Sequence, residues 1–148
     1  MISRKELANT AALLGFNIWQ AEKDYLQHLF LFFLSNQSAN EMAFKGGTAL
    51  QKAYGLNRFS IDLDFTQANE KFDCSVMLSK IAANIDSFGF ETRLIENKKT
   101  NSYTGHLKTK GVLFDGTDAS ISTLRIEISL REKPLIKLDM KEIIPLYN

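Results

Sequence analysis

Apolar and polar positions recur with different periods along the chain and predict a succession of helices and strands. Ser3 and Glu6 have the spacing of a capping box, and they open a helix-forming segment that stops at Gly15. A second, longer helix is expected after Asn17, with Gln20 as its capping partner. This helix carries a broad apolar stripe, formed by Tyr25, Leu26, Leu29, Phe30, Phe32 and Phe33. Its start is more polar and is expected to be more solvated, with Glu22, Lys23, Asp24 and Gln27. We expect it to be buried on most of its sides.

The next segment predicts two short strands around a short helix. The residues "EMAFKGG" predict a strand that ends at Gly46, "TALQKAYG" predicts a helix closed by Gly55, and "FSIDLDF" predicts the second strand. Apolar residues at helical steps then mark one face of a helix that ends at Gly89, namely Met77, Ile81, Ile85 and Phe88. Three more strands, in a meander beside the first two, are expected in "FETRLIEN", "YTGHLKTKGVLF" and "TLRIEISLRE".

Composition narrows the class of protein. The 148 residues predict a single domain, 1–148, and 45% apolar with 24% charged residues is typical of a folded, soluble protein. A net charge of +1 provides no overall attraction for nucleic acid or membrane, although the segment Arg93–Lys110 is locally basic. The most apolar run, Leu29–Leu34, is far shorter than the roughly 20 residues that span a bilayer. The lone Cys74 excludes an internal disulfide and fits a reducing cytoplasm.

Two adjacent glycines, Gly46 and Gly47, stand between a predicted strand and a predicted helix and are followed by Thr48. Glycine lets the backbone adopt a positive φ or approach a ligand closely. The free N–H groups and the dipole at a helix N-terminus favour an anion such as phosphate. Taken alone, the pattern fits either a tight structural turn or a phosphate site, and the pattern of a true P-loop is absent from the chain.

Asp62 and Asp64 lie about 15 residues further on, in a predicted strand. Side chains two apart on a strand share one face, so the two carboxylates are expected to point together, with Ile61, Leu63 and Phe65 pointing into a core. Two carboxylates about 6 Å apart repel by about 3 kcal/mol at an effective dielectric constant of about 20. The repulsion calls for a cation, and the candidates are Mg²⁺ or one of Lys45, Lys52 and Arg58. The alternative is a polar strand face exposed to solvent.

Glu127 is a candidate for a third carboxylate. In "TLRIEISLRE" the apolar residues alternate, which leaves Glu127 on the opposite face between Arg125 and Ser129. If this strand pairs with the strand of Asp62, Glu127 can reach the same metal ion. Otherwise Glu127 forms an ion pair with Arg125 or Arg131 on a solvated sheet face.

The stretch "KGGTALQKAYGLNRFSIDLDF" closely resembles the characteristic segment of the AbiEii/AbiGii-type nucleotidyltransferase toxins. The preceding "AEKDYLQHLFLFFLS" and the later "RIEISLRE" also resemble family elements, so the likeness covers most of Ala21–Arg131. The resemblance implies an α+β fold like the nucleotidyltransferase domain of DNA polymerase β, with a mixed sheet packed against helices. It also implies a cytoplasmic, Mg²⁺-dependent enzyme that transfers a nucleotide from a nucleoside triphosphate to an acceptor, tRNA in some relatives, under the control of an antitoxin.

Carried over by position, the resemblance implies roles for individual residues. The triphosphate would be bound by Gly46, Gly47, Thr48 and Ser60, and the metal by Asp62, Asp64 and Glu127. Lys52 and Arg58 would position phosphates or brace the carboxylates. Family members usually continue into a C-terminal helical region, which we expect to be absent after "IIPLYN". The alternative function is therefore a catalytically incomplete module that keeps the fold and binds nucleotide, RNA or a protein partner.

Overall fold

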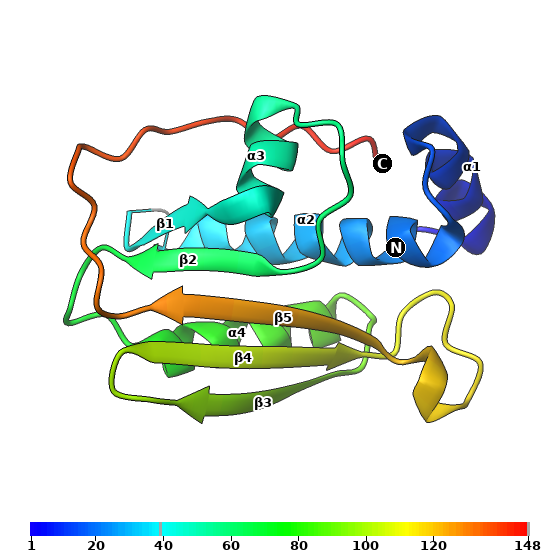
Figure 1. Cartoon of the computed structure of the whole chain (residues 1–148). Helices are drawn as coiled ribbons and strands as arrows, with labels where there is room; N and C mark the ends of the chain where they lie inside the picture. The colour runs from blue at the N-terminus through cyan, green and yellow to red at the C-terminus, as the bar shows by residue number, and fades with distance from the viewer. Residues whose placement is uncertain (39, 148) are drawn as a thin grey trace.

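The fold is a five-stranded sheet with helices on one face and its other face open (Figure 1). The computed structural model describes residues 1–38 and 40–147. Behind the sheet lie α2 and α4, while α3 stands at the edge formed by β1. In chain order the elements are α1 (Arg4–Leu14), α2 (Ile18–Ser38), β1 (Met42–Lys45), α3 (Gly46–Tyr54), β2 (Leu63–Gln67), α4 (Cys74–Ser87), β3 (Thr92–Lys98), β4 (Ser102–Thr109), the 3-10 turn η1 (Asp118–Ser120) and β5 (Ser122–Ser129).

The sheet is mixed, with the strand order β1-β2-β5-β4-β3. One pair, β2 with β5, is parallel, and the other three neighbouring pairs are antiparallel. The predicted meander of β3, β4 and β5 is confirmed, and β5 brings it against β2. In the resulting register Asp64 lies between Lys45 of β1 and Glu127 of β5. Directly opposite residues point to the same face of a sheet, so these three side chains share the open face.

The first two helices begin as the sequence predicts. Ser3 and Glu6 form the reciprocal bonds of a capping box at the start of α1, and the helix is closed by Gly15. Asn17 and Gln20 exchange the same kind of bonds at the start of α2. Each pair satisfies backbone N–H groups that have no partner inside the helix.

The core lies between the covered face of the sheet and the two helices behind it. Alternate residues of β2 and β5 are fully buried there, and they are Leu63, Phe65, Ile126 and Ile128. Phe30 of α2 packs against Phe65, and Leu78 and Ile81 of α4 complete the layer. Burying side chains of this size contributes about 1.5–3 kcal/mol each. Every second residue of β2 and β5 is thereby left on the open face.

The second predicted strand begins later than expected, at Leu63 instead of Phe59. The backbone of Ser60 bonds to side chains and not to a neighbouring strand, because its N–H donates to Gln51 and its carbonyl accepts from Gln27. As a consequence Ile61 is 54% exposed, and the prediction that it points into the core is wrong. Asp62 therefore stands at the end of a loop, immediately before the strand.

The start of α2 is also different from its prediction as a solvated segment. Glu22, Asp24 and Gln27 are all at most 3% exposed. Each of them bonds to a different segment of the chain, at Leu113, Lys52 and the 60–61 loop respectively. These polar side chains are buried because their partners come from elements distant in the sequence.

After β5 the chain crosses the molecule without forming a helix or strand up to residue 147. It passes α3, and its last described residues lie between α3 and α1 (Figure 1). Near its end, the Tyr147 ring packs edge-on against Tyr25 of α2. No helix in residues 1–38 or 40–147 is both long and apolar enough to cross a membrane.

Candidate active site

The two glycines at the start of α3 lie against the charged side chains that the sequence singled out. Gly46 has a φ of 75°, and a Cβ placed there would be 2.7 Å from Oδ2 of Asp64. A Cβ on Gly47 would be 2.9 Å from Nη2 of Arg58 and 3.2 Å from Oγ of Ser60. Only glycine allows so close an approach in these positions. The bend therefore faces one predicted metal ligand and two predicted phosphate contacts.

The N-terminus of α3 has the features of an anion site. The residue before the helix, Lys45, is extended and makes no side-chain cap to the first turn. The first N–H groups of a helix are unpaired within the helix, and with its dipole they favour phosphate. Arg58 stands beside this turn and is exposed, and no carboxylate of the described residues is within ion-pair distance of it. Two nitrogens of its guanidinium can donate to two phosphate oxygens at the same time.

Asp62 and Asp64 both belong to the open face of the sheet. Burial, and then the carboxylates of Asp62 and Glu127, raise the pKa of Asp64 even though Lys45 and Arg125 oppose the shift. Burial and the neighbouring carboxylates thus make ionisation of Asp64 less favourable. Two carboxylates on one face fit Mg²⁺, which typically takes one or two protein carboxylates and completes its shell with water and phosphate oxygens.

Glu127 lies next to Asp64 in the register, but its carboxylate has another partner. Its Oε2 atom is 2.8 Å from Nη2 of Arg125, whose Nη1 atom is 3.3 Å from Oδ2 of Asp62. Among residues 1–38 and 40–147 no three His, Cys, Asp or Glu side chains are grouped so that they could hold a metal ion. The three carboxylates expected from the sequence share one face but are not grouped as three metal ligands, and Arg125 contacts Glu127 more closely than Asp62.

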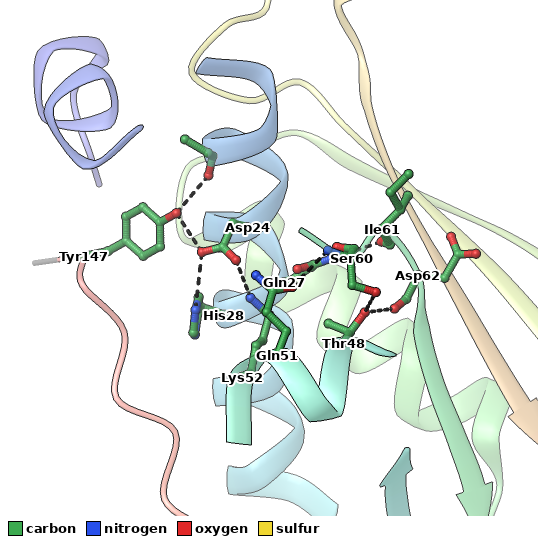
Figure 2. A network of polar contacts seen from close by, with 11 residues as sticks. Asp24, Gln27, His28, Thr48, Gln51, Lys52, Ser60, Ile61, Asp62 and Tyr147 are labelled. Carbon is green, nitrogen blue, oxygen red and sulfur yellow. Dashed lines mark hydrogen bonds and ion pairs between the residues drawn. The ribbon is translucent and has the colours of Figure 1, made fainter. Parts of the chain in front are cut away.

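The loop before Asp62 is held from two sides, as Figure 2 shows. The Thr48 hydroxyl donates to the Asp62 carbonyl and lies 2.7 Å from the Ser60 hydroxyl. The Gln27 amide donates to the carbonyls of Ser60 and Ile61 at 3.0 and 2.8 Å. Thr48 is fully buried, so its side chain cannot contact a triphosphate as predicted. It acts instead on the position of Asp62.

Lys52 is likewise directed away from the two predicted metal ligands. Its Nζ atom is 2.6 Å from Oδ1 of Asp24, and the Lys52 side chain is only 2% exposed. His28 and Tyr147 contact the same carboxylate through Oδ2, at 3.4 and 2.8 Å (Figure 2). Because it is buried in this ion pair, Lys52 neither binds phosphate nor braces Asp62 and Asp64, contrary to its prediction. It joins α3 to α2.

The sequence analysis gave no site role to three residues that hold the site together, Asp24, Gln27 and Arg125, although its alternative for Glu127, an ion pair with Arg125, is the one that the structure forms. A signal for the first two was present, since Asp24 and Gln27, with His28, recur at helical spacing inside an otherwise apolar helix. Such a polar stripe indicates buried partners. The position of Arg125 depends on the parallel register of β5 with β2, which no local pattern specifies.

Comparison with known proteins identifies the family. The sequence profile of the nucleotidyltransferase AbiEii toxins of type IV toxin–antitoxin systems matches residues 29–148. The chain belongs to this family. The AbiEii family is the one that the sequence resemblance indicated, so that prediction is confirmed. A search of curated proteins finds no match.

Three solved structures have a similar fold, and the descriptions of two of them name a nucleotidyltransferase. MenT4, a nucleotidyltransferase toxin from Mycobacterium tuberculosis, has a TM-score of 0.66 at 23% identity, over 99% of this chain and 49% of that one. A protein from H. pylori described as a nucleotidyltransferase has a TM-score of 0.58 at 29% identity, over 76% and 46%. JHP933 from Helicobacter pylori has a TM-score of 0.54 at 26% identity, over 78% and 45%. The AbiEii chain spans about half the length of these structures, and its predicted nucleotidyltransferase fold is confirmed.

Proposed function

We propose that this chain binds a nucleoside triphosphate with Mg²⁺ and transfers a nucleotide from it to an acceptor, as the catalytic part of a toxin. The observation that carries the proposal is the close approach of Gly46 to Asp64. It brings the free N–H groups of α3 within reach of the same ligand as the two aspartates. A site that binds phosphate on one side and a divalent cation on the other is what nucleotidyl transfer requires.

In this proposal, different residues of the chain bind the phosphates and the metal. The first turn of α3, at Gly46 and Gly47, binds phosphate oxygens through backbone N–H groups, and Arg58 adds a positive charge beside Ser60. Asp62 and Asp64 hold the metal. When bound, Mg²⁺ supplies positive charge that stabilises the charge developing on the transferred phosphoryl group. Because transfer of this kind depends on positioning and electrostatics, a rigid bend and a fixed loop are the main contributions of the protein.

Calorimetric titration of the protein with nucleoside triphosphates, with and without Mg²⁺, tests this proposal. We expect Mg²⁺ to strengthen binding, and the double variant Asp62→Ala, Asp64→Ala to lose about tenfold or more in affinity, which is about 1.4 kcal/mol. The matched control is Asp139→Ala with Glu142→Ala, which removes two charges from the exposed C-terminal segment. Equal affinities for the two double variants, or no binding by the unaltered protein, would exclude the proposed site.

We also propose tRNA as the acceptor, along the open face of the sheet. A groove of about 610 Å³ lies at the far end of this face and is lined in part by Arg93, Lys108 and Thr123. These three residues are cross-strand neighbours. Because Thr123, Arg125 and Glu127 alternate along β5, the groove opens on the same face as the acidic site. Basic groups along such a path support binding of an RNA strand through its phosphates.

The test is covalent labelling of total tRNA with a labelled nucleotide and Mg²⁺. The variant Arg93→Glu, Lys108→Glu should weaken tRNA binding and labelling by about tenfold at moderate salt and leave triphosphate binding unchanged. The control is Lys98→Glu with Lys99→Glu, at the tip of the same hairpin. If the two variants label tRNA equally, the groove is not the acceptor path. An antitoxin that restrains the activity is proposed from family membership alone.

A catalytically incomplete binding module is the second candidate. The observation that favours it is the engagement of Asp62 and Glu127 by Arg125. The labelling experiment separates the two functions, because a module binds nucleotide and transfers none. Label on RNA that disappears in the Asp62→Ala, Asp64→Ala variant would exclude the module.

A further inference from the structure

Arg125 stands among the carboxylates of the proposed metal site. It projects from the open face of β5, and the side chains of Arg125, Asp62 and Glu127 are 44%, 38% and 42% exposed. One guanidinium nitrogen contacts Asp62 at 3.3 Å and another contacts Glu127 at 2.8 Å. The planar fork of arginine is suited to such a double contact, which the single ammonium of a lysine does not reproduce.

The backbone position of Arg125 beside Asp62 follows from the register of the sheet. Leu63 pairs with Ile126 and Asp64 pairs with Glu127 in the parallel ladder of β2 and β5. Arg125 comes directly before Ile126, and Asp62 comes directly before Leu63. Because Ile126 and Leu63 are paired, Arg125 and Asp62 are neighbours on the open face. Both acids therefore lie within the length of the arginine side chain as long as this ladder is preserved.

The same geometry sets Arg125 against a divalent cation. A cation bound to Asp62 would lie within a few ångströms of the guanidinium that now contacts this carboxylate. At about 5 Å, a unit positive charge and a divalent ion repel each other, and salt and movement of the exposed side chain reduce this repulsion without removing it. The two positive groups cannot both keep their full interaction with Asp62.

We propose that Arg125 is the internal counter-ion of the acidic site, and that it competes with the divalent metal for Asp62 in the nucleotide-free protein. The inference rests on the proposed function, because it requires that Asp62 bind a metal. Arg125 is then a positioning residue: it holds Asp62 and Glu127 in place before the metal binds, and it lowers the affinity for metal in the absence of nucleotide. Metal binding requires the contact between Arg125 and Asp62 to break.

The test measures binding of Mn²⁺ alone, without nucleotide, from the paramagnetic resonance signal of the free ion. The full chain is compared with Arg125→Ala and with Arg131→Ala, an exposed arginine of the following segment that carries the same charge change. We expect Arg125→Ala to bind Mn²⁺ about tenfold more tightly than the unaltered protein, and Arg131→Ala to differ from it by less than about twofold. Arg125→Lys should fall between the two.

A double variant tests whether the gain in Mn²⁺ affinity depends on Asp62. Adding Asp62→Asn to Arg125→Ala should abolish the tighter binding, because the gain is assigned to that carboxylate. If Arg125→Ala does not fold, Arg125→Gln serves in its place and has the same expected result. Equal affinities of the Arg125 and Arg131 variants would overturn the inference and leave the proposed function standing. Absence of Mn²⁺ binding in every variant, Arg125→Ala included, would also overturn the inference, whereas the proposed function is tested separately by the titration with nucleoside triphosphate and Mg²⁺.

Discussion

At the scale of single residues, Gly46 combines a left-handed backbone conformation with a close approach to a predicted metal ligand. Its φ of 75° lies in the left-handed region, and its α-carbon faces the carboxylate of Asp64. Gly55, at the other end of α3, has a nearly identical φ of 70°, and a Cβ added to it would meet no atom within 4 Å. The two glycines therefore differ chiefly in the contact with Asp64.

This pair of glycines allows the contact to be separated from backbone strain. We expect Gly55→Ala to lower the free energy of unfolding by about 1 kcal/mol, the cost of a left-handed alanine. Gly46→Ala should lower it by about 2–3 kcal/mol, since the methyl group also displaces the Asp64 carboxylate. Urea unfolding of both variants measures the difference. Equal losses would mean that the carboxylate moves aside at no cost.

Asp24 is a buried carboxylate whose ionisation is favoured by its partners. Burial opposes its ionisation, but the bonds from His28 and Lys52 more than compensate and lower the pKa of Asp24 to about 2. Burial lowers the pKa of Lys52, and the charge of Asp24 opposes that shift. We consider Asp24 ionised and Lys52 protonated near neutral pH, because neutralising either group would leave the other as a buried charge without this ion pair.

The lowered pKa of Asp24 predicts a specific acid dependence. A carboxylate whose folded pKa lies below its unfolded value, near 3.8, stabilises the fold above that pH and loses this contribution as the pH falls through about 2. The expected loss is about 2 kcal/mol in the free energy of unfolding. Urea unfolding over this pH range should show it in the unaltered protein and in Asp118→Asn, an exposed control. A parallel pH dependence in Asp24→Asn would contradict the assignment.

At the scale of elements, α2 positions the segments that make up the site. Lys23 donates to the Thr123 carbonyl at the start of β5, and Glu22 accepts from the Leu113 backbone N–H. Burial raises the pKa of Glu22, although bonds from the backbone of Leu113 and Val112 oppose the shift. With Gln27 on the loop before Asp62 and Asp24 on Lys52 of α3, α2 contacts several distant segments through polar side chains. The helix therefore packs in the core and also holds in place the segments that carry the site.

The bonds made by Gln27 provide a test of this role. Gln27→Met keeps the volume of the side chain but leaves the Ser60 and Ile61 carbonyls without their donor. We expect a loss of about 1–3 kcal/mol in the free energy of unfolding, together with faster amide exchange in residues 58–62. Gln37→Met, at an exposed position near the end of the same helix, should change stability by less than about 0.5 kcal/mol. Unchanged exchange in this loop would show that Gln27 does not hold it.

At the scale of the whole molecule, the C-terminal segment returns to the N-terminal half of the chain. The Tyr147 hydroxyl lies 2.8 Å from Oδ2 of Asp24 and 3.1 Å from the Ala21 carbonyl, both on α2. Burial, followed by the charge of Asp24, raises the pKa of Tyr147, so its hydroxyl stays protonated. Between β5 and this contact the segment exposes several large apolar residues, among them Leu135, Ile136 and Ile144. Tyr147 thus links the end of the described chain to the network around Lys52.

Removal of one oxygen atom tests this link. We expect Tyr147→Phe to lower the free energy of unfolding by about 1 kcal/mol and to speed limited proteolysis within residues 131–146. Tyr54→Phe is the matched control, because the Tyr54 side chain is 61% exposed. Cleavage of the two variants at the same rate would show that the hydroxyl does not fasten the segment.

Much of this architecture could be predicted from sequence because its signals are local. The caps at Ser3 and Asn17, the glycine that ends α1 and the alternation in β5 all act over a few residues. The error at Phe59–Asp62 arises because the interactions of this segment are with residues distant in the sequence. That segment has the composition of a strand, but glutamines from α2 and α3 take its backbone bonds.

The sequence by itself determined the order and type of the elements, the family, and the position of a glycine bend shortly before two aspartates, because propensity, capping and spacing depend on near neighbours. The tertiary structure alone decided the partners of the charged groups. It joined Lys52 to Asp24 and Arg125 to Asp62, and it buried Thr48. These pairings depend on strand register and helix packing between segments far apart in the chain, and the energy of a charged group is set by the atoms that surround it in space.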